Sequence, residues 1–160
     1  MLNRLFPKQF DNTYTGWRLA LWLFVLVMAA KGLQATESIL NTREVAVNAD
    51  GIPLDSFPPA AATEVLSIFA VLGIYLLILP LQSVIVMLRY RAMVPFMYLC
   101  MIVLQLSIRL LHLFRDTPPS GALDHPVGFY VNIAILTVTV VGFVLSLLPR
   151  KTVSHAAAGA

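Results

Sequence analysis

The chain has little of what soluble enzymes and metalloproteins use. Its 160 residues include one cysteine, Cys100, and three histidines, and only 12% are charged. One cysteine excludes an intrachain disulfide and a multi-cysteine metal site. The sequence also lacks a Gly-rich phosphate loop, a nucleophile elbow and an HExxH motif. No motif therefore supports catalysis or a metal centre, and we favour a non-enzymatic protein.

Sequence support for a cofactor or a nucleic-acid partner is missing as well. His112 is the only histidine within a long apolar run, because His125 and His155 lie in a loop and in the tail. A haem or chlorophyll would need His112 as its axial ligand, but a lone histidine near a helix end more often hydrogen-bonds at the interface. Basic residues do not alternate with aromatic ones in a patch. We expect no cofactor and no nucleic-acid partner.

What the chain does have is hydrophobic residues, 59% of the total, gathered in four long runs. Each run is long enough to cross the ~30 Å of bilayer hydrocarbon at ~1.5 Å per helical residue. Inside lipid such runs must be helices, because only then are their backbone groups satisfied. We predict an all-α fold, a four-helix transmembrane bundle that forms a single domain over residues 1–151. The expected spans are 17–40, 62–88, 95–114 and 129–148, with a long loop over 41–61 and a flexible tail over 152–160.

Lysine and arginine are distributed unevenly between the two sides of this bundle. The side with both termini carries seven Lys or Arg and one acidic residue, a net charge of +6. The other side carries four Lys or Arg and seven acidic residues, a net charge of −3. Cytoplasmic segments of membrane proteins carry the excess of Lys and Arg, so we predict that both termini are cytoplasmic. We expect helix 17–40 to be a retained anchor rather than a cleaved signal peptide.

The connections carry predictions of their own. Residues 42–54 suggest two short strands around a turn at 48–51, which predicts a small hairpin or cap. Pro80 removes a backbone hydrogen bond and should kink or loosen the second helix. The turn 89–94 is so short that the second and third helices should be antiparallel neighbours, and the proline-rich segment 116–127 should be a stiff link. Residues 1–16 form either an interfacial anchor or a frayed terminus.

Each predicted helix has one polar stripe when its residues are placed at ~100° intervals. We expect all four stripes to face inward. The second helix contributes Glu64, Tyr75 and Gln82. The stripe of the third helix includes Tyr98 and Gln105, and that of the fourth includes Asn132, Thr139 and Ser146. Toward the outer third of the membrane these stripes converge on one level. The resulting candidate cluster, and candidate ligand site, comprises Lys31, Gln34, Glu64, Gln105, Arg109, His112 and Asn132.

Three interpretations of this cluster remain open. A charge at membrane depth costs from ~2.5 kcal/mol upward unless it is paired or wetted. Lys31 and Arg109 therefore either snorkel or pair with Glu64 and Glu37 as internal glue, or bind a lipid- or quinone-type amphiphile, or serve a small oligomeric transporter or channel. We favour the first interpretation. With it we favour an accessory or scaffold component that contacts membrane lipids and associates with other membrane proteins or with itself.

Four segments carry a resemblance to a known group of proteins. They are MLNRLFPKQF at 1–10, GIPLDSF at 51–57, RYRAMVPFMYL at 89–99 and GFYVN at 128–132. Together they resemble a family of small, uncharacterised four-helix bacterial inner-membrane proteins. The resemblance implies the same four-span layout and an inner-membrane location. It implies no activity and no site residue, because the group has no activity to transfer.

Overall fold

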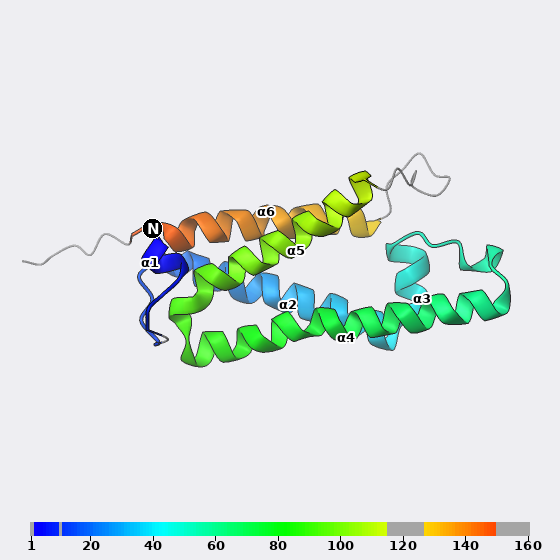
Figure 1. The fold of residues 1–160 in the computed structure, drawn as a ribbon, viewed down its shortest axis with the longest axis horizontal. Helices are drawn as coiled ribbons and strands as arrows, with labels where there is room; N and C mark the ends of the chain where they lie inside the picture. The colour runs from blue at the N-terminus through cyan, green and yellow to red at the C-terminus, as the bar shows by residue number, and fades with distance from the viewer. Residues whose placement is uncertain (1, 10, 115–126, 150–160) are drawn as a thin grey trace, which may run out of the picture.

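The computed structural model describes residues 2–9, 11–114 and 127–149, and these residues form helices and short turns without a β-strand among them. Among the described residues, four helices are long and apolar enough to cross a membrane. Figure 1 shows how they are arranged. They are α2 (Arg18–Leu40), α4 (Pro59–Arg89), α5 (Val94–Phe114) and α6 (Val127–Leu147). The prediction of an all-α fold with four membrane-length helices is confirmed. Their bounds lie within about three residues of the expected spans.

The helices are arranged with α2 between α4 and α6, and with α5 packed mainly against α6. A short 3-10 turn, η3 (Arg91–Met93), joins α4 to α5. From this turn the two helices diverge along the length of the molecule (Figure 1). The prediction that they are neighbours is therefore wrong except near the turn, because each packs on a different central helix.

Close packing between α2 and α4 explains this arrangement. A Cβ at Gly73 would lie 2.9 Å from a side-chain carbon of Ile39 and 3.2 Å from the carbonyl oxygen of Ala35, so glycine lets the two backbones approach. Further along, the Pro80 ring would lie 3.5 Å from a Cβ at Gly32. The helix α4 runs through Pro80 without interruption, so the proline serves as a packing residue on the α2 side.

The largest fully buried side chain, Tyr98 of α5, lies in the hydrophobic core. Its hydroxyl donates a 2.7 Å hydrogen bond to the Ala20 carbonyl of α2, and its ring meets Phe24 edge-on at 5.2 Å. A glycine of α6, Gly142, lies directly against the same ring. Tyr98 thus holds α2, α5 and α6 together in one half of the bundle.

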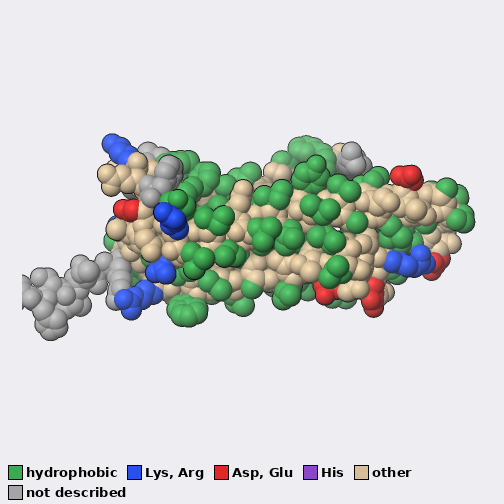
Figure 2. Space-filling view, turned by 90° about the horizontal axis from the view of Figure 1, so that it is seen from below, with side chains coloured by type: hydrophobic (Ala, Val, Ile, Leu, Met, Phe, Trp, Pro, Cys, Tyr) green, Lys and Arg blue, Asp and Glu red, His purple; other side chains and the backbone are tan. Residues whose placement is uncertain are grey.

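The outside of the bundle is apolar and its charges lie at the two ends. No more than 33% of the most apolar stretch of any long helix is buried inside the bundle. In Figure 2 hydrophobic side chains cover the middle, Lys and Arg lie mainly at one end and Asp and Glu mainly at the other. We call these the basic end, which holds Arg4, Arg18, Arg89 and Arg91, and the acidic end, which holds Glu37, Glu44, Asp50, Asp55 and Glu64.

The segment before α2 folds against the basic end. It contains a short helix, α1 (Leu2–Leu5), from which the Arg4 guanidinium donates a 2.8 Å hydrogen bond to the Leu147 carbonyl of α6. The ring of Phe6 lies 5.8 Å from that of Phe96 on α5. These contacts hold the segment against the ends of α5 and α6. Residues 2–9 therefore do not form the frayed terminus that was one of the two alternatives.

The predicted hairpin between α2 and α4 is wrong. The chain continues as one helical turn, α3 (Thr42–Glu44), a π-helix, η1 (Val45–Ala49), and a 3-10 turn, η2 (Leu54–Ser56). Of the turn predicted at 48–51, Asn48 and Ala49 belong to η1, and the chain turns after them, at Asp50 and at Gly51, which has a φ of 70°. An isolated two-stranded hairpin buries little surface, whereas the helical path buries Ala46 completely against the bundle.

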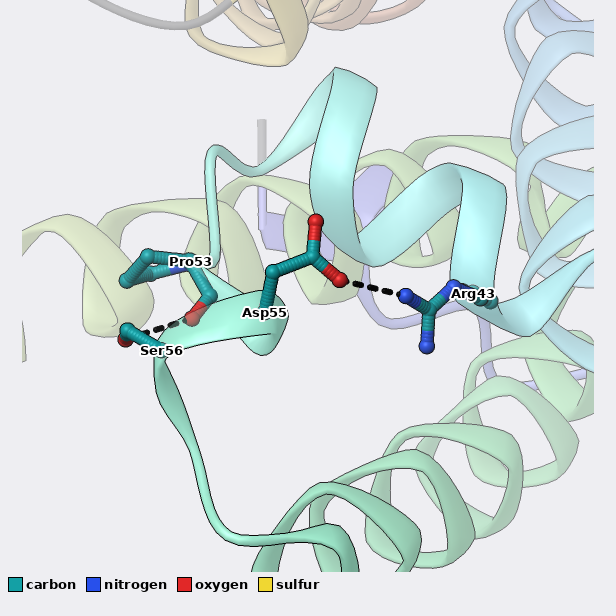
Figure 3. Close-up of polar contacts among 4 residues, drawn as sticks. All are labelled: Arg43, Pro53, Asp55 and Ser56. Atoms are coloured by element: carbon teal, nitrogen blue, oxygen red, sulfur yellow. Dashed lines mark hydrogen bonds and ion pairs between the residues drawn. The ribbon is translucent and has the colours of Figure 1, made fainter.

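A surface ion pair fastens this cap. Arg43 donates to the Asp55 carboxylate at 2.6 Å, and Ser56 donates to the Pro53 carbonyl at 2.7 Å (Figure 3). Both charged side chains are more than half exposed, so the pair adds little stability. Of the link predicted over 116–127, only Val127 is described, as the first residue of α6, and the tail predicted over 152–160 lies outside the described residues.

Candidate functional site

Lys31 is the centre of the polar cluster and lies just past the midpoint of α2, on the side toward the acidic end. Its ammonium donates to the Gln34 side-chain oxygen at 2.9 Å and to the Asn132 side-chain oxygen at 2.6 Å. The Asn132 amide nitrogen in turn donates to the Gly128 carbonyl at 2.9 Å. Asn132 of α6 is therefore hydrogen-bonded to α2 through its amide oxygen and to the first turn of its own helix through its amide nitrogen.

Arg109 lies at the same level as Lys31. Tyr98 of α5 is hydrogen-bonded to Ala20 of α2, so these two residues are level. Lys31 follows Ala20 by eleven residues and Arg109 follows Tyr98 by eleven, which is about 16 Å along each helix axis. Because α2 and α5 run in the same direction, the two cations are level as well. The Arg109 guanidinium lies 5.5 Å from the ring centre of Phe129, one turn before Asn132 on α6. The predicted convergence of Lys31, Arg109 and Asn132 on one level is thus observed, with α6 as the bridge.

Gln105 lies one turn from Arg109, toward the middle of α5. Its side chain is 7% exposed, and neither its amide oxygen nor its amide nitrogen has a hydrogen-bond partner within the described structure. An unsatisfied buried amide costs about 1–3 kcal/mol. Gln105 is therefore inside the bundle, as predicted, but does not join the Lys31 hydrogen bonds.

Glu64, a predicted member of the cluster, lies far from Lys31 along the bundle axis. Pro80 of α4 is level with Gly32 of α2, the neighbour of Lys31. Glu64 precedes Pro80 by sixteen residues, so it lies about 24 Å from the level of Lys31 along the axis of α4. The predicted pairing of the cations with Glu64 and Glu37 is wrong for the described residues: amide oxygens bind Lys31, and Glu37 accepts from Asn41 at 2.5 Å. The side chain of His112 lies outside the described structure.

A residue that the sequence analysis missed lies beside the cluster. The π-helix η1 brings Asp50 to the start of α6, where a carboxylate oxygen would lie 3.5 Å from a Cβ at Gly128. Gly128 is the residue whose carbonyl accepts from Asn132. The prediction of a hairpin concealed this proximity, because only the helical path carries the chain across the end of α6.

The polar stripe of α4 does not face inward as predicted. Tyr75 is 67% exposed, and Gln82 is also exposed, whereas Gly73, Pro80 and Ser83 are buried. The stripes of α5 and α6 do face inward, with Tyr98, Gln105, Thr139 and Ser146 buried. Gln82 lies about 3 Å beyond Pro80 on α4, near the middle of the bundle. One amide at mid-depth is thus directed away from every described helix.

Two surface cavities of the described structure lie at the two ends of the bundle. One of about 420 Å³ at the basic end is lined by residues that include Arg4, Lys8 and Tyr14, and one of about 500 Å³ at the acidic end by residues that include Arg43 and Asp55. Burial raises the pKa of Tyr14 to about 12, and its hydroxyl is buried without a hydrogen-bond partner among the described residues. Neither cavity includes a member of the Lys31 cluster.

Comparisons with protein-family models, with curated proteins and with solved structures found no match to this chain. The resemblance to a family of bacterial inner-membrane proteins therefore stays a prediction.

Proposed function

We propose that this chain is a multi-pass protein of the bacterial inner membrane, with its basic end in the cytoplasm, that acts without catalysis as an accessory or scaffold component. It works by associating, through its lipid-facing surface, with other membrane proteins or with itself. The segregation of charge to the two ends supports the orientation, because the basic end holds the excess of Lys and Arg.

The outward direction of Gln82 is the observation that carries the proposal. Hydrocarbon offers no hydrogen-bond partner, so an amide exposed to lipid at mid-depth is costly. A second helix that covers this face and supplies a polar group removes the cost, and interhelical hydrogen bonds of this kind hold membrane helices together. The Lys31 cluster, by contrast, satisfies its own cation with Gln34 and Asn132, as internal glue would.

A second candidate function rests on the two cations. No described carboxylate forms an ion pair with Lys31 or Arg109, and both side chains are only half-buried. An anionic amphiphile, such as a lipid whose phosphate approaches from the side of the bundle, would neutralise them. This candidate requires a retained ligand, which the first does not.

Native mass spectrometry of the protein, extracted in a patch of its own membrane, tests these two functions together. The accessory function predicts a reproducible complex with a protein partner or with a second copy. The amphiphile function predicts a stoichiometric lipid or quinone that is lost in Arg109→Gln, while Arg18→Gln at the opposite end retains it. A bare monomer without a protein or a ligand would refute both.

A further inference from the structure

A regular row of exposed residues runs along the outer face of α4. Its members are separated alternately by three and four positions, and we call them the outer stripe. They are Ile68, Val71, Tyr75, Ile78, Gln82, Ile85 and Arg89, and all are exposed. Seven positions that repeat in this way form the seam of a left-handed pair of helices, in which residues from two helices interdigitate.

The outer stripe lies opposite the surface of α4 that α2 covers. Gln82 follows Gly73 by nine residues, which at ~100° per residue places the two on opposite sides of the helix. Gly73 and Pro80 face α2. The outer stripe is exposed, and α5 diverges from α4 beyond their shared turn (Figure 1), so no other described long helix covers it. The outer stripe thus provides one side of a two-helix interface, and no described helix of this chain provides the other side.

The chemistry of Gln82 identifies what that second helix is. A glutamine amide has both donors and an acceptor, so two glutamines satisfy each other when they meet. The charge bias gives every copy of the chain the same orientation, so two α4 helices that pair side by side are parallel and bring equal residues to equal depth. A second copy therefore supplies a matching amide at mid-depth by symmetry, whereas an unrelated helix would need a polar residue at that same level.

We propose that this protein forms a parallel two-fold dimer through the outer stripe of α4, with the two Gln82 side chains hydrogen-bonded to each other at its centre. The inference rests on the proposed function and names a second copy of this chain as the partner. The charged member of the seam, Arg89, is at the basic end of α4, where water and salt screen the repulsion between two copies.

Disulfide cross-linking in native membranes tests the seam position by position. The background variant is Cys100→Ser, which removes the only cysteine of the chain. Single cysteines at Val71, Ile78 and Gln82 should cross-link into a covalent dimer under mild oxidation. Val84→Cys is the matched control, since its side chain is exposed on α4 but lies about 160° around the helix from Gln82, and it should stay monomeric. Equal cross-linking at control and stripe positions would refute the proposed seam.

Substitution of Gln82 tests the central hydrogen bond. Gln82→Leu should lower the dimerisation constant in lipid by about 3- to 30-fold, the range of interhelical hydrogen bonds in membranes. Gln82→Asn keeps an amide and should retain most of the affinity, and Val84→Leu should leave it unchanged. An unchanged constant in Gln82→Leu would refute the glutamine pair.

Failure of this inference can be told apart from failure of the proposed function. If native mass spectrometry finds a different protein bound and no stripe position cross-links to a second copy, the dimer is refuted and the accessory function stands. If the chain is a bare monomer and no stripe position cross-links, both are refuted.

Discussion

The tight contact between Gly142 and Tyr98 makes a sharp prediction about packing. A Cβ at Gly142 would lie 2.5 Å from the Tyr98 ring carbon that bears the hydroxyl, and closer still to the hydroxyl oxygen. Tyr98 cannot readily move away, because it is fully buried, bonded to the Ala20 carbonyl and packed edge-on against Phe24. Gly142→Ala should therefore destabilise the bundle.

The magnitude follows from three opposing contributions. Overpacking in a filled core costs about 1–3 kcal/mol, and loss of the Tyr98 hydrogen bond costs about 1 kcal/mol. Alanine is a better helix former than glycine by about 1 kcal/mol, which offsets part of this. We expect a net loss of about 1–3 kcal/mol in the free energy of unfolding, measured by titrating SDS into mixed micelles and following tryptophan fluorescence.

Two variants separate this clash from a general effect of alanine. Gly32→Ala is the matched control, because its Cβ would meet the Pro80 ring at an ordinary 3.5 Å, and it should be neutral or stabilising. In a Tyr98→Phe background the hydroxyl is gone, so Gly142→Ala should cost about 1 kcal/mol less than in the native chain. A neutral Gly142→Ala, or an equal cost in both backgrounds, would refute the packing of α6 against Tyr98.

Three further predictions concern polar contacts. Asn132→Leu should lower the free energy of unfolding by about 1–3 kcal/mol, because the half-buried Lys31 loses an acceptor, whereas Asn132→Asp keeps one and should largely preserve it; SDS titration measures both. Burial holds the pKa of Tyr14 at about 12 against 10.0 ordinarily, so its contribution to stability is complete below pH 10 and is lost as the pH rises toward 12; that part of the measured pH dependence should vanish in Tyr14→Phe. Asp55→Asn should change thermal stability by less than about 0.5 kcal/mol, because its ion pair with Arg43 is exposed, and a large loss would contradict that assignment.

Hydrophobic run length and residue depth predicted much of this structure. The four runs gave the helices, because apolar length is a property of the sequence itself. The level shared by Lys31, Arg109 and Asn132 was also predictable, since depth follows from residue counts along helices of known rise. The hydrogen bond from Lys31 to Asn132 is a consequence of that shared level.

The direction of the α4 stripe was not predictable from periodicity. Periodicity shows that Tyr75 and Gln82 share a face, but a neighbouring helix decides whether that face is covered. The signal that could have indicated it is the pair Gly73 and Pro80, seven residues apart on the opposite face, where close approach to α2 is possible. The helical path through Val45–Ala49 likewise depends on burying Ala46, a tertiary effect that overrides local strand preference.

The proposed insertion of four helices, with the basic end in the cytoplasm, underlies the accessory function, the parallel dimer and the depth assigned to the cluster. Labelling of single cysteines by a membrane-impermeant maleimide measures it most directly, in the Cys100→Ser background. We predict that Asn48→Cys, in the cap at the acidic end, reacts in intact cells, and that Lys8→Cys, at the basic end, reacts only after the membrane is opened. Reaction of Lys8→Cys in intact cells, with Asn48→Cys protected, would contradict the account.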